Sequence, residues 1–197
     1  GGSASVSELN RLIKNYERFV QLPWDQNLAG PQKVWFVVYD KAQERRLRLR
    51  IPEFEIATRN AGHGWFHLDL TDAFAEWMAA QEYREAYFED PEALDLPLRD
   101  QFLPFLAQRL RAVLTAPGVD NNTVVAVSGV GALFGLARVS VLVDRVTNAI
   151  RGRLLVFFPG EVTFNGDNPR RGRNFRLLDA RDGWDYHAIV ITADSEV

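Results

Sequence analysis

Hydrophobic positions along this chain switch repeatedly between helical spacing and short continuous runs. From Leu9 to Val20 the apolar residues recur every three or four positions, which predicts a helix, and Ser5 to Glu8 reads as a capping box at its start. Residues 34–40 read V-W-F-V-V-Y-D, the pattern of a strand covered on both faces. Residues 1–5 are interpreted as a cloning remnant and residues 6–197 as a single domain.

The same alternation continues to the end of the chain. Further helices are expected from Asp40 to about residue 61, from Thr71-Asp72 onward and over about 98–115, with kinks at Pro52 and Pro104. Further strands are expected at 65–70, 123–128, 153–158, 175–178 and 186–191. This order predicts an α/β fold with a mostly parallel sheet, helices on both faces and a P-loop-like or Rossmann-like topology. The last two strands are candidates for an antiparallel hairpin at one edge.

A glycine-rich turn follows the strand at 123–128 and has the outline of a phosphate-binding loop. Gly129, Gly131 and Gly135 lie in G-V-G-A-L-F-G, ahead of a helix expected from the apolar spacing of residues 139–150. Backbone N–H groups at such a turn favour anions, so Gly129 and Gly131 are candidate phosphate-binding residues. However, no lysine follows Lys41, and Phe134 stands where a dinucleotide fingerprint needs its third glycine. We therefore expect a binding protein without an intact nucleotide motif and without a cofactor.

Two patterns resemble metal or catalytic sites only in part. His63 and His67 lie four residues apart, but in a strand-like segment and not on a helical face, so no metal site is predicted. Ser128 precedes Asp179, Asp182 and His187 in the order of a catalytic triad, yet A-V-S-G-V departs from the nucleophile elbow G-x-S-x-G. No catalytic residue is predicted from these patterns.

Carboxylates follow two of the expected strands. Asp40 ends the first, and Asp69 and Asp72 end the second. The carboxyl ends of parallel strands line the ligand crevice, so these groups could hold Mg²⁺. They are also good helix caps, and this second interpretation is favoured.

An acidic and aromatic segment ends the helix that begins at Thr71-Asp72. Tyr83, Tyr87 and Phe88 lie among Glu82, Glu85, Glu89 and Asp90. Aromatic side chains of this kind anchor protein partners, and packing in the core explains them equally well.

Composition places the chain among ordinary globular proteins. It has 197 residues, of which 47% are hydrophobic, and no cysteine, so disulfides and thiolate metal sites are excluded. No apolar run is long enough to span a bilayer and no signal peptide is visible, so a cytoplasmic protein without membrane association is expected.

The net charge of −3 is unevenly distributed. The first half of the chain is acidic, and the positive charges of the second half are all arginines. A basic stretch of this kind contacts nucleic acid or an acidic partner, or it forms a solvated face. The candidate DNA-contacting residues are Arg151, Arg153, Arg170, Arg171, Arg173 and Arg176.

The sequence D-A-R-D-G-W at residues 179–184 is a candidate protein interface. Arg181 and Trp184 are of types enriched at interface hot spots, and Asp182 and Glu161 are expected at the same rim. In the alternative interpretation, Trp184 packs inward and Arg181 pairs with a neighbouring aspartate to fix the turn.

Seven segments together resemble the BrxB family of BREX bacteriophage-exclusion systems, in order and over nearly the whole chain. They are residues 22–40 (L-P-W-D-Q-N-L-A-G-P-Q-K-V-W-F-V-V-Y-D), 61–65 (A-G-H-G-W), 69–77 (D-L-T-D-A-F-A-E-W), 82–90 (E-Y-R-E-A-Y-F-E-D), 129–135 (G-V-G-A-L-F-G), 151–161 (R-G-R-L-L-V-F-F-P-G-E) and 177–186 (L-L-D-A-R-D-G-W-D-Y). The loop at 165–173 departs from the family by being longer and more basic.

The resemblance implies a bacterial cytoplasmic protein encoded beside a DNA methyltransferase, a large ATPase and PglZ, which has an alkaline-phosphatase-like domain. It implies no catalytic activity. The expected role is an accessory or adaptor subunit that binds PglZ, and other BREX proteins, or helps to assemble the defence complex, with an indirect association with DNA. The alternatives are a degenerate nucleotide- or phosphate-binding domain with weak or no hydrolysis, and a DNA-contacting subunit that uses the arginines.

Overall fold

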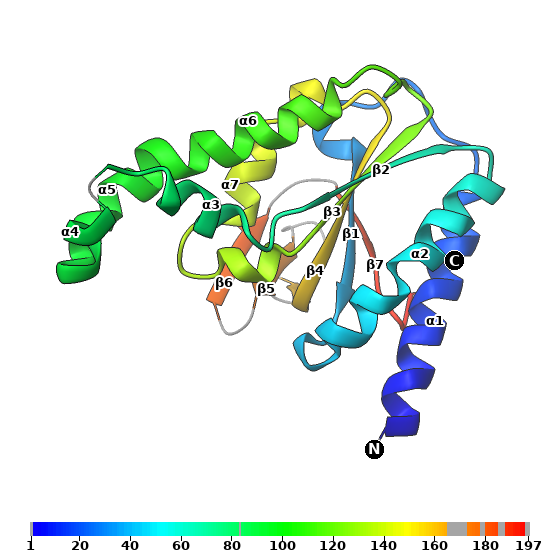
Figure 1. Cartoon of the computed structure of the whole chain (residues 1–197). Coiled ribbons are helices and arrows are strands. Elements are labelled where there is room, and N and C mark those ends of the chain that lie inside the picture. The colour runs from blue at the N-terminus through cyan, green and yellow to red at the C-terminus, as the bar shows by residue number, and fades with distance from the viewer. Residues whose placement is uncertain (1, 83, 165–172, 178–179, 185–187, 196–197) are drawn as a thin grey trace.

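Helices and a central sheet alternate along the chain in the computed structural model (Figure 1), which describes all residues except 1, 83, 165–172, 178–179, 185–187 and 196–197. The helices are α1 (Gly2–Val20), α2 (Glu44–Asn60), α3 (Ala73–Ala79), α4 (Arg84–Glu89), α5 (Asp95–Pro97), α6 (Leu103–Leu114) and α7 (Val139–Asp144). The strands are β1 (Val34–Tyr39), β2 (Gly64–Asp69), β3 (Thr123–Ser128), β4 (Arg153–Phe164), β5 (Arg173–Leu177), β6 (Ala180–Trp184) and β7 (Ile189–Ile191).

The sheet confirms the predicted α/β class. Strands β2, β3, β4, β1 and β7 lie side by side in that order, and all of them run parallel. This arrangement differs from the Rossmann order 3-2-1-4-5-6. Numbered along the chain and read from the β7 edge, the parallel strands follow the order 5-1-4-3-2. The segment after central β1, D-K-A-Q-E, contains no glycine, and the P-loop-like part of the prediction stays a prediction.

The predicted antiparallel hairpin is present, but its second strand and its place differ from the prediction. The hairpin consists of β5 and β6, and β5 pairs antiparallel with the far end of central strand β4, from Gly160 to Phe164. Strand β7, which was expected to form the hairpin, instead pairs in parallel with β1 at the sheet edge. The mismatch arises because β4 continues past Pro159 and offers a long template for antiparallel pairing.

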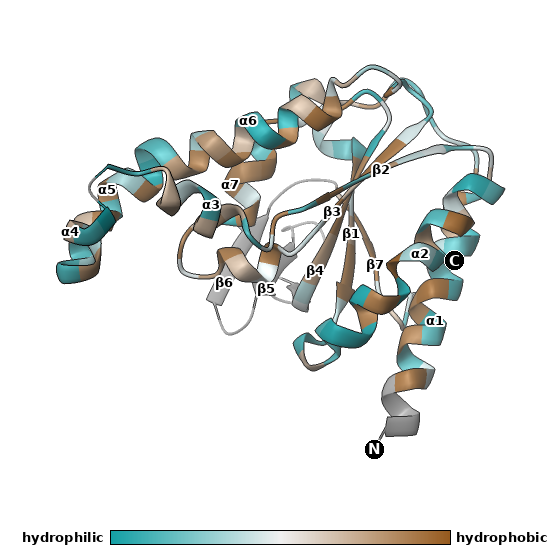
Figure 2. Cartoon of the chain, in the orientation of Figure 1, coloured by the Kyte–Doolittle hydropathy of each residue, from teal (hydrophilic) through white to brown (hydrophobic). Residues whose placement is uncertain are grey.

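Two apolar cores lie on opposite faces of the sheet. Val34, Phe36 and Val38 of β1 pack toward α3, α6 and α7, whereas Trp35, Val37 and Tyr39 pack toward α1 and α2. All six residues of β1 are buried, as a strand covered on both faces requires. Figure 2 shows β1 and the described part of β4 mostly brown, with α1 and α2 carrying teal residues beside brown ones. Helices on both faces were predicted, and this is confirmed.

The helix boundaries test the capping box and the proline kinks that the sequence predicts. Helix α1 already includes Gly2, so Ser5 lies inside the helix and the predicted capping box is wrong. Helix α2 continues through Pro52 without a break. Before Pro104 the chain forms a π-helical turn, Leu98–Phe102, because proline lacks an N–H group and its ring displaces the preceding turn.

Candidate functional site at the carboxyl ends of β2 and β3

The glycine turn after β3 serves close packing. Gly129 has a φ of 78°, and a Cβ atom there would lie 2.5 Å from the Asp69 Oδ1 atom and the Thr71 backbone nitrogen. A 3₁₀ helix, Val130–Leu133, follows the turn, and α7 begins only at Val139 and has six residues. The helix expected over 139–150 is confirmed at its start but ends at Asp144. Because it begins ten residues after Gly129, the turn lacks the helix dipole on which a phosphate site depends. Phosphate binding by Gly129 and Gly131 stays a prediction. The carboxylate of Asp69 lies beside this turn.

Two of the three aspartates at the strand ends accept hydrogen bonds from the residues that follow them. Asp40 accepts a hydrogen bond from the Ala42 backbone N–H at 2.9 Å, and Asp69 accepts from the Thr71 N–H at 2.9 Å and from its hydroxyl at 2.6 Å. Asp72 makes no such capping bond. The described residues contain no group of three or more histidine, cysteine or acidic side chains arranged for a metal ion. The helix-capping interpretation is confirmed for Asp40, which caps the 3₁₀ turn Lys41–Gln43. Asp69 instead fixes the turn at Thr71, ahead of α3.

A chain of polar contacts crosses this edge of the sheet. The Tyr39 hydroxyl donates to Glu44, and Arg48 Nε donates to the same carboxylate at 3.1 Å. Arg48 also donates to the Thr71 hydroxyl, which in turn bonds to Asp69. Helix α2 thus connects the end of β1 to the end of β2 above the intervening strands.

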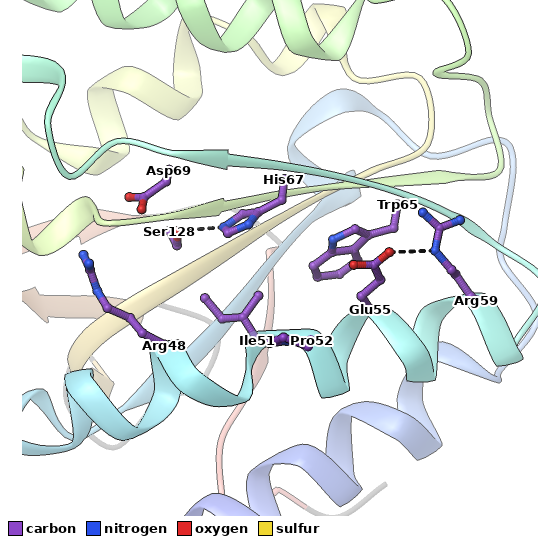
Figure 3. A pocket seen from close by; sticks show the side chains of 9 residues that line it. All are labelled: Arg48, Ile51, Pro52, Glu55, Arg59, Trp65, His67, Asp69 and Ser128. Atoms are coloured by element: carbon purple, nitrogen blue, oxygen red, sulfur yellow. Dashed lines mark hydrogen bonds and ion pairs between the residues drawn. The ribbon is translucent and has the colours of Figure 1, made fainter. Parts of the chain in front are cut away.

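A cavity of about 400 Å³ opens between α2 and these strand ends (Figure 3). Its lining residues come from three elements: Arg48, Ile51, Pro52, Glu55 and Arg59 of α2, Trp65, His67 and Asp69 of β2, and Ser128 of β3. Successive side chains of a strand alternate between faces, so the three residues of β2 all point toward α2. The volume falls in the range of small-molecule sites.

Ser128 and His67 form a hydrogen-bonded pair in this cavity. The distance from His67 Nε2 to Ser128 Oγ is 2.7 Å. The strands fix both side chains, because β2 and β3 pair residue by residue and bring Asp69 opposite Ser128. The sequence order had paired Ser128 with His187, which lies outside the described residues. The parallel register of two neighbouring strands is the signal that would have identified His67.

Charged groups surround the pair. Desolvation lowers the pKa of His67, and the nearby carboxylates of Asp69 and Glu55 partly oppose this by favouring the imidazolium. Partial burial disfavours ionisation of Asp69, but its pKa is lowered overall by hydrogen bonds from Thr71 and by the Arg48 charge. Arg59 forms an ion pair with Glu55 at 2.8 Å. The cavity therefore combines a neutral imidazole, a hydroxyl and two guanidinium groups.

His67 should make the protein less stable in mild acid. Its pKa is lower in the folded state than its ordinary value, so near and below that value the unfolded chain binds more protons and stability falls as pH falls. We expect the melting temperature of the wild-type protein to decline from pH 7.5 to 5 more steeply than that of His67→Gln. Calorimetry at intervals of half a pH unit measures the two slopes, and parallel curves would contradict the shift.

Arg153 is a correction to the predicted DNA-contacting set. It is only 3% exposed, and its guanidinium stacks over Trp24 at 4.8 Å and donates to the carbonyl oxygens of Gly152 and Asp25. A buried cation held by carbonyls cannot reach a phosphate backbone. Arg151 is exposed and donates to the Val119 carbonyl oxygen at 2.9 Å.

The other predicted surface residues that the structure describes lie in β4, β5 or β6. Arg173 and Arg176 belong to β5, whereas Arg170 and Arg171 lie outside the described residues. Arg181, Asp182 and Trp184 belong to β6, and Glu161 of β4 pairs across from Arg176. Glu161 thus lies on one side of β5 and β6 on the other. The predicted roles of these residues in protein and DNA contacts stay predictions.

Comparison with protein-family models, curated proteins and solved structures gave no match to this chain. No helix in the described part of the chain is both long and apolar enough to cross a membrane. The functional argument therefore depends on the residues and their geometry.

Proposed function

We propose that this protein is an accessory subunit of a BREX-type phage-defence system, which binds PglZ in the bacterial cytoplasm and helps to assemble the complex. The resemblance of seven ordered segments to the BrxB family supports this role, which requires no catalytic group. The structural observation that carries it is an exposed acidic arm, defined as residues 84–98.

The acidic arm consists of α4, the 3₁₀ turn Pro91–Leu94 and α5, and it projects from the body beyond α3 (Figure 1). None of these three elements contains a buried residue. Phe88 is 71% exposed and Leu96 is 57% exposed. Packing in the core, the alternative explanation for this aromatic segment, is therefore excluded for Phe88.

The arm is nevertheless anchored to the body. Tyr87, Leu94 and Leu98 pack against the core on the α6 side of the sheet. A fixed position lowers the entropy cost of binding, because the exposed side chains are already oriented. Phe88 and Leu96 are thus suited to act as anchors for a partner protein.

The charge of the arm indicates the chemistry of that partner. Its five carboxylates make no ion pair within the described part of the chain, and they are Glu85, Glu89, Asp90, Glu92 and Asp95. Complementary potentials speed association and fix orientation. The matching surface is an apolar pocket with a basic rim, and we assign that surface to PglZ.

Loss of the exposed aromatic anchor should weaken the complex. Phe88→Ser is expected to reduce the affinity for PglZ by about tenfold, which corresponds to about 1.4 kcal/mol and is typical of a hot spot. The melting temperature should not change, because Phe88 contributes nothing to the core. Isothermal titration calorimetry with purified PglZ measures the affinity.

Leu49→Ser is the matched control, since Leu49 is 78% exposed on α2, which covers the opposite face. It should bind PglZ like the wild type. The proposal fails if the wild-type protein and PglZ elute separately at micromolar concentrations. An equal loss of affinity in both variants would show that the arm is not the interface.

A further inference from the structure

Beyond the proposed binding role, we infer that the cavity between α2 and β2 is an acyl-transfer site, in which Ser128 is the nucleophile and His67 is the general base, and that it hydrolyses small esters carrying an anionic group. The sequence alone favoured a protein without catalysis, because the elbow motif is absent and the nearest histidine in the chain order was His187. The inference depends on the geometry of the cavity.

The positions of the two side chains meet the first requirement for nucleophilic catalysis. A serine hydroxyl is activated by a base within hydrogen-bond reach, about 2.6–3.2 Å, and His67 Nε2 lies 2.7 Å from Ser128 Oγ. Both residues line the open cavity (Figure 3). Because the paired strands β2 and β3 carry them, the geometry is held by backbone hydrogen bonds and not by a loop.

The surroundings of His67 meet the second requirement, which is a base that can accept a proton and then be stabilised as a cation. Desolvation lowers the pKa of His67, which favours the neutral imidazole that a general base requires. The carboxylates of Asp69 and Glu55 favour its charged form. They would stabilise the imidazolium at the step in which Ser128 loses its proton, as the acidic residue of a triad does.

The remaining lining residues define the class of substrate. Ile51, Pro52 and Trp65 form an apolar wall, and Arg48 and Arg59 bring two guanidinium groups to the same cavity. The ion pair of Arg59 with Glu55 uses its Nε atom, which leaves the guanidinium edge for a carboxylate or phosphate. An ester of modest size with one anionic group fits this combination of volume and charge.

The reaction balances with water as the only co-reactant. Ser128 Oγ attacks the ester carbonyl carbon while its proton passes to His67 Nε2. The bond between the carbonyl carbon and the alcohol oxygen breaks, and His67 returns the proton to the leaving alcohol. Water then attacks the acyl-serine and gives a proton to His67. The bond between the acyl carbon and Ser128 Oγ breaks, His67 returns the proton to Oγ, and the carboxylic acid is released from the regenerated enzyme.

Covalent labelling of the full chain tests the inference. We expect a fluorophosphonate reagent to add once, at Ser128, as located by peptide mass spectrometry. Ser128→Ala should lose the adduct completely, and His67→Gln should slow its formation at least about 100-fold, the usual contribution of a general base. Ser140→Ala is the matched control, because Ser140 is a buried serine on α7 outside the cavity, and it should label at the wild-type rate.

Hydrolysis of two chromogenic esters tests the substrate class. The p-nitrophenyl monoester of succinic acid should be cleaved faster than p-nitrophenyl acetate, and Arg59→Ala should reduce cleavage of the succinate monoester more than cleavage of the acetate, so that the ratio of the two rates falls. Wild-type protein that forms no adduct above the level of heat-denatured protein would overturn the inference, and so would labelling that is unchanged in His67→Gln. The arm packs against the opposite face of the sheet, so neither result affects the PglZ experiment.

Discussion

Gly152→Ala is expected to destabilise the protein by about 3 kcal/mol, the upper part of the range for overpacking a core. An added Cβ atom would overlap the carbonyl oxygen of Thr123 and lie 2.8 Å from its nitrogen and 3.0 Å from the Asp120 carbonyl oxygen. All three atoms belong to backbone, so no side chain can rotate to relieve the clash. Gly152 precedes β4 directly and faces the start of β3, so the pairing of two central strands depends on it.

Urea unfolding followed by circular dichroism measures this loss as a lower midpoint with an unchanged slope. Gly131→Ala is the matched control. Its Cβ would meet only the Pro159 ring, at the ordinary contact distance of 3.4 Å, and its stability should remain within about 1 kcal/mol of the wild type. Equal midpoints for the two variants would show that the β3–β4 junction tolerates a methyl group.

Arg153→Ala should also cost about 3 kcal/mol, through the loss of hydrogen bonds and of packing. The substitution leaves the carbonyl oxygens of Gly152 and Asp25 without their donor and empties the space beside Trp24 and Trp35. Burial lowers the pKa of this guanidinium, but its hydrogen bonds and aromatic neighbours hold the cation in place.

Arg151→Ala is the control, since Arg151 is exposed and makes one described contact, with the Val119 carbonyl oxygen. Its free energy of unfolding should change by less than about 1 kcal/mol. Arg153→Lys should fall between the two, because lysine retains the charge but loses the planar stacking and the paired donors. A wild-type midpoint for Arg153→Ala would contradict the structural role of this residue.

Local sequence patterns predicted the buried strands well and the long-range arrangement poorly. Strands β1 and β3 read as continuous β-branched or aromatic runs, and both are buried throughout. Periodicity carries no information on which strand pairs with which, so the 5-1-4-3-2 order and the extension of β4 into the hairpin came only from the structure. The charge of Arg153 likewise suggested a surface residue, since nothing local signals that Trp24 and Trp35 enclose it.

The candidate site likewise combines residues that the sequence analysis identified with an arrangement that it did not predict. Ser128, His67 and Asp69 were each considered as candidates from the sequence. Ser128 and His67 are 61 positions apart in the chain, and only the register of β2 on β3 brings them together. The acidic and aromatic composition of the arm was recognised in the sequence. Its exposure was not predicted, because it depends on how few of its side chains pack against the core in the folded protein.

The place of β1 in the sheet has a consequence for biosynthesis. Val34 pairs with Leu154 and Trp35 with Ile189, so this strand leaves the ribosome well before either of its neighbours has been synthesised. Such high contact order slows folding and leaves apolar segments open to aggregation. The nascent chain therefore passes through a long interval in which a strand that is buried throughout in the folded protein depends on α1, α2 or a chaperone for cover.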